Sequence, residues 1–262
     1  MYIDTPKLDF LNLSLLITHY NRPLSLNRLL EEISKLNITF SEIIVSDDGS
    51  KIEIQQMLQL LQQKYNFRLI TTPVNKGLAN NVNKGQDAVK TPYTLYIQED
   101  FVPTIFFPAK LVESLAILDE RPEIDMARYS AYWKYPYLAS IRNGFSEMKF
   151  NILKGGYKKF YMYSDHPHLR RSNFIEKFGR YPEGGIKSDK AEYLMMMSFL
   201  RNKGKAIYFD EYKVLFLHYN DSKETSTIIR NYLSSTNNIV IANIRHLYRH
   251  LKFNFDYWYL KN

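Results

Sequence analysis

Apolar residues in the first hundred positions form two kinds of pattern: short continuous runs and stripes with a helical period. The continuous runs have strand length and occur in LSLLIT (13–18), SEIIVSDDGS (41–50), FRLITT (67–72) and YTLYIQ (93–98). Between the first three runs, apolar residues recur at helical spacing, at Leu26, Leu29, Leu30 and Ile33 and at Ile54, Met57, Leu58 and Leu61. The segment 75–89 is typical of a loop followed by a further helix. The pattern therefore predicts alternating strands and helices up to residue 98.

Strands of nearly continuous apolar character, separated by amphipathic helices, are typical of a parallel sheet with helices on both faces. We therefore predict an α/β fold with a mostly parallel central sheet. In such sheets a ligand binds beyond the carboxyl ends of the strands. The residues that follow the strands are indeed polar: Thr18, His19, Tyr20, Asp47, Asp48, Glu99 and Asp100. Solvated strand ends would also be polar, but the joint occurrence after three strands favours a ligand site.

The composition narrows the class of protein. The chain has 262 residues, of which 45% are hydrophobic and 15% aromatic, so it can bury a sizeable core. It has no cysteine, which excludes disulfides and thiolate metal sites and is compatible with the cytoplasmic location that we expect. We expect neither a secretion signal nor a membrane span, because no basic n-region and no run of about 18 apolar residues is visible.

The net charge of +8 favours anionic partners such as nucleotides, nucleic acid or a lipid surface. The sequence contains neither GxGxxG after the first strand nor GxxxxGK[ST], so a dinucleotide fold and a P-loop ATPase are disfavoured. A nucleotide can still be bound through a metal ion together with Lys and Arg. A nucleotidyltransferase is disfavoured because THYNRP, after the first strand, has no glycine.

Several segments, taken in order, resemble the successive motifs of family 2 glycosyltransferases with the GT-A fold. They are SLLITHYNRPLSLNRLLEEIS, EIIVSDDGS, NKGLANNVNKG and LYIQEDFVP, within about 12–105, and a looser match continues through HLRRSNFIEKFGRYPEG and AEYLMMMSFLRNKGKAIYF to VLFLHYND. The resemblance implies a GT-A domain over residues 1–224. It also implies metal-dependent, inverting transfer of a sugar from a UDP- or GDP-sugar to a hydroxyl acceptor. The acceptor would be a glycan or a lipid-linked glycan, in bacterial surface polysaccharide or glycolipid synthesis.

The resemblance also assigns residues to the nucleotide. Its motifs imply that the base, ribose or diphosphate is contacted by Thr18, Tyr20, Asp47, Lys76 and Asn80. Two of these assignments have simpler alternatives. Asp47, together with Asp48 and Gly49, could form only a turn that caps the next helix, and Lys76 could be an ordinary solvated lysine.

The QED segment falls on the acidic metal motif of the family, with Gln98 in place of the usual first acid. The resemblance implies that Asp100 is a metal ligand and that Glu99 reaches a sugar hydroxyl or a metal-bound water. His218 matches a histidine that often supplies a further metal contact, although it could also be an ordinary histidine at a strand end. Mg²⁺ and Mn²⁺ favour oxygen ligands, so we expect one of these cations as cofactor.

The catalytic base is less well defined. The family places a Glu-Asp pair about twelve residues before a glycine. Counting back from Gly204, Glu192 occupies the position of the Glu, but Tyr193 occupies the position of the Asp. We predict Asp189 or Glu192 as the base, slightly favour Asp189 because the family uses Asp, and keep Asp165 as a third candidate. His166 and His168 are expected to line the acceptor entrance.

Residues 225–262 form a predicted helical extension that ends in RHLYRHLKFNFDYWYLKN, where basic and aromatic residues interleave. It could simply pack on the catalytic domain, or it could dock on an anionic membrane at its inner face. No nucleic-acid recognition motif accompanies it, so we expect no nucleic-acid partner. Gln98 and Tyr193 also keep open a non-catalytic protein that binds sugar nucleotides or a partner.

Overall fold

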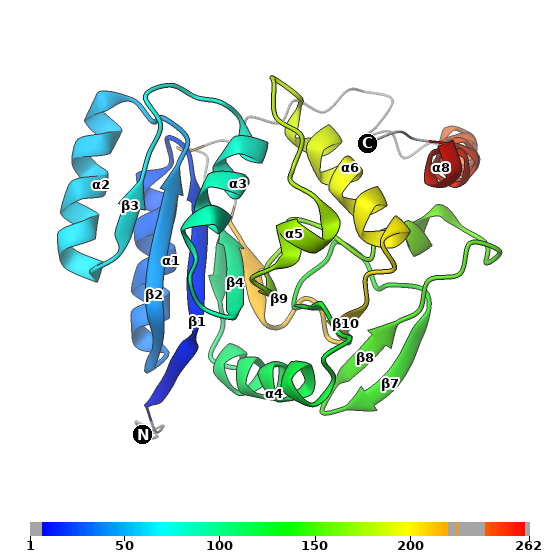
Figure 1. Cartoon of the computed structure of the whole chain (residues 1–262), viewed down its shortest axis with the longest axis horizontal. Helices are drawn as coiled ribbons and strands as arrows, with labels where there is room; N and C mark the ends of the chain where they lie inside the picture. Colours follow the sequence, from blue (N-terminus) through cyan, green and yellow to red (C-terminus); the bar gives the residue numbers. More distant parts are fainter. Residues whose placement is uncertain (1–6, 220–223, 225–238, 260–262) are drawn as a thin grey trace.

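The computed structural model describes residues 7–219, 224 and 239–259 and contains a nine-stranded mixed sheet between two layers of helices (Figure 1). The strands are β1 (Leu8–His19), β2 (Ile38–Asp47), β3 (Arg68–Ile70), β4 (Tyr93–Gln98), β5 (Phe101–Pro103), β6 (Met126–Arg128), β7 (Leu138–Arg142), β8 (Phe145–Met148), β9 (His168–Arg171), β10 (Ala206–Phe209) and β11 (Phe216–His218). The helices are α1 (Pro23–Lys35), α2 (Ile52–Tyr65), α3 (Leu78–Ala88), α4 (Phe107–Glu120), α5 (Phe174–Phe178), α6 (Ser188–Arg201), α8 (Ile239–Tyr259) and the 3-10 helix η1 (Tyr157–Phe160).

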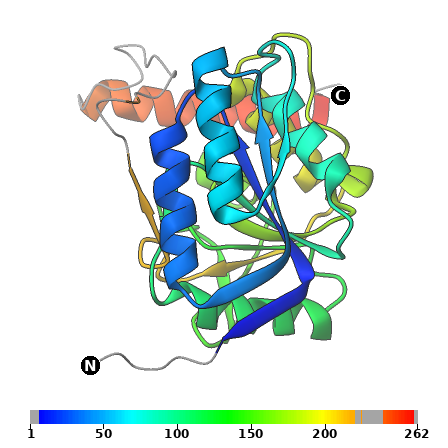
Figure 2. The same cartoon turned by 90° about the vertical axis from the view of Figure 1, so that its left-hand side faces the viewer.

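The amino-terminal half of the sheet is parallel, as predicted. Its strands lie in the order β3-β2-β1-β4, and every neighbouring pair is parallel. β1 alternates its side chains between two cores, since Leu15 and Ile17 belong to one and Leu16 to the other. The first core contains apolar residues of α1, α2 and α4, and the second contains those of α3, α5 and α6. Both faces are therefore covered, and Figure 2 shows α1 and α2 side by side on one of them.

The prediction of a mostly parallel sheet is wrong for the second half. β9 lies between β4 and β6 and is antiparallel to both, and β8 and β7 continue the sheet with antiparallel pairs. Only β6 and β10 are parallel there. These strands are three to five residues long, and several carry buried polar residues such as His168 and Arg170. Such short, partly polar strands lack the continuous apolar runs on which the prediction depended.

Two features outside the main sheet position the site. β11 pairs with β5 as a separate two-stranded antiparallel ribbon, which brings residue 218 opposite residue 101. Helix α8 packs against η1 and α6, and both views place it at the end of the molecule where β1 ends (Figures 1 and 2). The division of the chain at residue 224 stays a prediction, and residues 225–238 of the predicted extension lie outside the described part. None of the described helices has both the length and the apolarity needed to cross a bilayer.

Candidate active site

The polar residues that follow strands β1, β2 and β4 do meet at one edge of the sheet. β1 is the central strand of the three, and its register pairs Thr18 with Gln98 on one side and His19 with Asp47 on the other. Thr18 is buried and its hydroxyl lies 3.1 Å from the Tyr96 hydroxyl, whereas Tyr20 is half-buried. The parallel register therefore assembles the predicted site residues.

Asp47 is the most completely bonded acid of this edge. Its Oδ1 accepts from His19 Nδ1 at 2.8 Å and from the Ser50 hydroxyl at 2.5 Å. Its Oδ2 accepts from the Ser50 backbone N–H at 3.0 Å and the Thr71 hydroxyl at 2.9 Å. Burial alone would raise the pKa of Asp47, but the hydrogen bonds from His19 and Ser50 outweigh burial and hold it at about 2. Asp47 organises the edge in this way, and its contact with a nucleotide base stays a prediction.

Replacing Asp47 by Asn is expected to lower the free energy of unfolding by about 2 kcal/mol at neutral pH, because the depressed pKa makes the charged form stabilising. This contribution is present above the ordinary aspartate pKa of 3.8 and is lost as the pH falls toward about 2. Urea unfolding of both proteins between pH 7 and acid pH measures the difference. An Asp47→Asn protein with the same acid sensitivity as the original would contradict this account.

The neighbouring Asp48 holds a different segment. Its two carboxylate oxygens accept from the backbone N–H groups of Lys76 at 2.9 Å and Gly77 at 2.8 Å, so it fixes the loop before α3. Neither Asp47 nor Asp48 caps α2, whose N-cap residue Lys51 has no side-chain cap bond. Lys76 itself is exposed, and its role at the nucleotide stays a prediction.

Asn80 lies on α3, where its side chain is already bonded within the protein. Its Nδ2 donates to Glu183 Oε2 at 2.7 Å. Glu183 also accepts from Asn83 Nδ2 at 2.8 Å through its other oxygen, so the same carboxylate bridges two residues of α3. Asn80 Oδ1 is buried without a hydrogen-bond partner among the described residues. The contact of Asn80 with a nucleotide stays a prediction.

Glu99 and Asp100 form the acidic centre of the edge, in the turn between β4 and β5. Asp100 Oδ2 accepts from Arg22 Nη1 at 2.9 Å and lies 3.3 Å from His218 Nε2. The same Arg22 nitrogen is 3.5 Å from Glu99 Oε1. Burial raises the pKa of Asp100, but hydrogen bonds from His218 and Arg22 outweigh it and lower the pKa overall. Burial and then the Asp100 charge raise the pKa of Glu99 to about 7.

His218 reaches Asp100 because β11 returns to β5. His218 pairs with Phe101 across this ribbon, its ring stacks on the Phe101 ring at 4.7 Å, and the Tyr219 N–H donates to the Asp100 carbonyl at 2.9 Å. The two predicted metal ligands are 118 residues apart in the sequence. The ribbon makes them neighbours.

These residues fit a divalent cation that is held mainly by its substrate. Asp100 Oδ1 is buried and has no hydrogen-bond partner in the described part of the chain, while His218 Nε2 stands beside Oδ2. The described residues contain no cluster of three or more His, Asp or Glu side chains that could hold a metal by themselves. Mg²⁺ and related cations are commonly bound by one or two protein carboxylates and completed by substrate phosphates, which agrees with this small ligand set.

The three candidates for the base differ in their surroundings. Asp189 lies exposed in the first turn of α6 and accepts from the Lys190 N–H at 2.9 Å, whereas Glu192 is half-buried one turn later. Glu192 Oε1 accepts from the Asp165 backbone N–H at 3.0 Å. Burial raises the pKa of Glu192, against the opposing effects of that N–H and of Arg128.

Asp165 is buried more deeply. Its Oδ1 accepts from the hydroxyls of Tyr163 at 2.9 Å and Tyr181 at 2.7 Å. Burial and the Glu192 charge raise its pKa well above the ordinary value. Next along the chain, His166 packs on Phe101, with ring centroids 5.1 Å apart. The Asp165-His166 dipeptide therefore connects Glu192 with the Asp100–His218 side of the site.

Tyr193, which stands where the family has Asp, holds the C-terminal helix. Its hydroxyl donates to Asp256, accepts from Lys252 Nζ at 3.3 Å, and its ring lies 4.9 Å from that of Phe253. All three partners lie on α8. Tyr193 therefore has a structural contact with α8 at the position where the family has Asp.

Sequence reasoning did not single out Arg22, gave His19 no individual role and misplaced His168. Arg22 lies in the loop between β1 and α1, three residues after His19, and this position was the available signal. His19 joins Asp47 to the Arg22 N–H, which donates to His19 Nε2 at 3.1 Å. His168 was expected at the acceptor entrance, but it is completely buried on β9 beside Tyr96. Its place on a central strand, with both neighbours in the sheet, explains the error.

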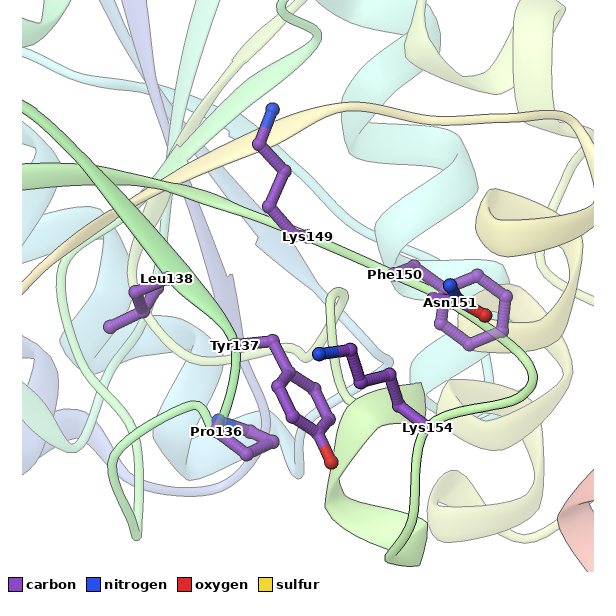
Figure 3. A pocket seen from close by; sticks show the side chains of 7 residues that line it. All are labelled: Pro136, Tyr137, Leu138, Lys149, Phe150, Asn151 and Lys154. Carbon is purple, nitrogen blue, oxygen red and sulfur yellow. The ribbon is translucent and has the colours of Figure 1, made fainter.

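A hollow of about 470 Å³ lies on another part of the surface (Figure 3). Its lining comes from the segment that leads into β7, from the first residue of β7 and from the loop after β8, and includes Tyr137, Lys149, Phe150 and Lys154. None of the predicted site residues lines this hollow. It adjoins α8 instead, because the Phe150 ring lies 5.3 Å from that of Tyr257.

Comparison with known proteins gives a consistent result. The model of the family described as "Glycosyl transferase family 2" matches residues 14–176. An "Uncharacterized glycosyltransferase" of Haemophilus influenzae is 27% identical over 121 residues, which are 45% of this chain and 38% of that protein. Poly-beta-1,6-N-acetyl-D-glucosamine synthase of Staphylococcus epidermidis is 25% identical over 101 residues, which are 38% of this chain and 24% of that enzyme. The chain therefore spans well under half the length of either relative.

Solved structures resemble the fold over a larger share of the chain. S. aureus TarS 1-349 in complex with UDP-GlcNAc has a TM-score of 0.57 at 16% identity, covering 87% of this chain and 62% of that one. The mannosyltransferase PcManGT from Pyrobaculum calidifontis, in complex with GDP-Man and Mn2+, has a TM-score of 0.56 at 12% identity, covering 92% of this chain and 63% of that one. At these identities the likeness concerns the fold.

Proposed function

The chain belongs to glycosyl transferase family 2, with the GT-A fold, and from this we propose that it transfers a sugar from a nucleoside diphosphate to a hydroxyl acceptor with inversion at the anomeric carbon. The observation that carries the proposal is the junction of Asp100, His218 and Arg22 at the carboxyl edge of the parallel strands. A divalent cation bound by Asp100 and His218 would offset negative charge on the leaving diphosphate.

Arg22 supports the binding of the same diphosphate from the protein side. Its Nη1 is bonded to Asp100, whereas its Nε and Nη2 are buried without hydrogen-bond partners among the described residues. A guanidinium with unused N–H groups is suited to phosphate oxygens. We propose that these N–H groups of Arg22 donate hydrogen bonds to the diphosphate of the donor, while Asp100 holds the Arg22 side chain in place.

Glu192 is our choice of base. The acceptor hydroxyl passes its proton to the Glu192 carboxylate while its oxygen bonds to the anomeric carbon. The bond from that carbon to the phosphate oxygen breaks, and the nucleoside diphosphate leaves with the electron pair. A raised pKa brings a carboxylate closer to the value that suits a general base at neutral pH, and the half-buried position keeps it accessible. Asp189 is the alternative on the same helix.

The names and ligands of similar proteins suggest the substrates. One relative is named a poly-beta-1,6-N-acetyl-D-glucosamine synthase, and the structural neighbours bind UDP-GlcNAc or GDP-Man. We propose a UDP- or GDP-sugar as donor and a glycan or lipid-linked glycan as acceptor, in bacterial polysaccharide or glycolipid synthesis. Residues 1–224 would form the catalytic domain and 225–262 its extension.

A thermal-shift series with UDP and GDP, each with and without Mn²⁺, tests the proposal. At a ligand concentration about 100 times Kd, binding stabilises by about 2.7 kcal/mol, so we expect one nucleotide with Mn²⁺ to raise Tm by roughly 5 °C or more. Release of free sugar from the matching nucleotide sugar then tests turnover. Metal-dependent binding without any turnover would indicate a non-catalytic binding protein, and no binding would refute the proposal.

A further inference from the structure

Helix α8 presents a second apolar face, which no described part of the chain covers. Six of its large apolar residues are each 60–64% exposed: Ile244, Leu247, Tyr248, Leu251, Phe255 and Trp258. Apart from the adjacent pair Leu247 and Tyr248, they recur every three or four residues, which puts them in one stripe along the helix. Single exposed apolar residues are ordinary, but a continuous stripe of this length marks an interaction surface.

The opposite face of α8 holds the helix firmly on the protein. Phe253 is 6% exposed and packs edge-on against Phe160 at 5.6 Å and Tyr157 at 6.0 Å. Tyr193 on α6 adds its hydrogen bonds with Asp256 and Lys252. These contacts fix the rotation of the helix about its axis, so the apolar stripe is held facing away from the rest of the protein.

Basic residues lie on α8 and on the segments near it. Helix α8 has three, Arg245, Arg249 and Lys252, and one acid, Asp256, which is paired with Lys252. Neighbouring segments add Lys158 of η1, Lys190 of α6, and Lys154 in the hollow of Figure 3. An apolar stripe on a basic helix complements a surface that is apolar inside and negatively charged outside.

We propose that α8 lies in the plane of an anionic phospholipid bilayer, with the stripe from Ile244 to Trp258 inserted at the boundary between headgroups and acyl chains. A second copy of the chain fits less well, because a symmetric pairing would bring two basic helices together at a net charge of +8 per chain. The helix lies at the end of the molecule where β1 ends (Figures 1 and 2), so docking would place the carboxyl edge of the sheet toward the membrane. The inference is independent of the proposed transferase activity.

Sedimentation of the full chain with vesicles tests the proposal without nucleotide or acceptor. We expect binding to phosphatidylcholine vesicles that contain phosphatidylglycerol, much weaker binding to phosphatidylcholine alone, and weakening by salt. The chain has two tryptophans. In a Trp133→Phe protein, the remaining Trp258 should shift its emission to the blue when the anionic vesicles are added.

The double change Leu251→Ser and Phe255→Ser removes two members of the stripe and should weaken vesicle binding about tenfold or more. Both residues are 62% exposed, so folding should be kept. Leu60→Ser is the matched control, because Leu60 is 66% exposed on α2, far from α8, and vesicle binding should not change. Equal binding by the double variant, or no binding by the original chain, would overturn the proposal. A concentration-dependent dimer that the double variant loses would assign the stripe to a second copy instead.

Discussion

Replacing Glu192 by Gln is expected to lower the rate of sugar transfer by about 10²- to 10⁴-fold, the range that general-base catalysis ordinarily contributes. The amide cannot take the proton of the acceptor hydroxyl. It keeps the size of the side chain and an oxygen that can accept from the Asp165 N–H, as Glu192 Oε1 does at 3.0 Å. We therefore expect unchanged Tm and donor affinity with reduced kcat, measured by steady-state transfer and nucleotide titration.

Asp189→Asn is the matched control, since it makes the same carboxylate-to-amide change one turn earlier on α6, at an exposed side chain. If Asp189 is a surface carboxylate without a catalytic role, we expect Asp189→Asn to change kcat by less than about threefold. The reverse result, with a large loss for Asp189→Asn and near-normal activity for Glu192→Gln, would assign the base to Asp189. Asp165 is a poor first target, because its bonds to Tyr163 and Tyr181 make folding defects difficult to separate from catalytic ones.

Asp100→Asn is expected to abolish the Mn²⁺-dependent part of UDP or GDP binding. The substitution removes the charge from the one carboxylate that faces both His218 and Arg22. At a ligand concentration about 100 times Kd, the lost stabilisation is about 2.7 kcal/mol. Calorimetric titration of nucleotide with and without Mn²⁺ measures the difference, and circular dichroism checks that the variant is folded.

Two further variants make this result specific. Asp119→Asn makes the same chemical change on α4, at the other end of the sheet (Figure 1), and should leave metal-dependent binding unchanged. Glu99→Gln should weaken transfer more than Mn²⁺ binding, if Glu99 contacts the sugar or a metal-bound water. Metal-dependent binding that survives in Asp100→Asn would refute the assignment of Asp100 as a ligand.

Much of the first half of the fold was predictable because its signals are local. The stripe Leu26, Leu29, Leu30 and Ile33 became the buried face of α1, and the run at 93–98 became β4 with the bounds expected. The second half was less predictable, because strands as short as β6 or as polar as β9 carry little periodicity. Their identity depends on the strands beside them.

The sequence by itself determined the order of strands and helices up to residue 98, the family, and the placement of acids and other polar residues just after β1, β2 and β4. Apolar periodicity and the polarity of strand ends reflect the burial of neighbouring residues, so they can be recognised in the sequence itself. Only the tertiary structure decided that Arg22 and His218 share Asp100, that Glu192 is more shielded than Asp189, and that Tyr193 bonds to α8. These outcomes depend on long-range pairing and on desolvation by distant segments, which no local pattern encodes.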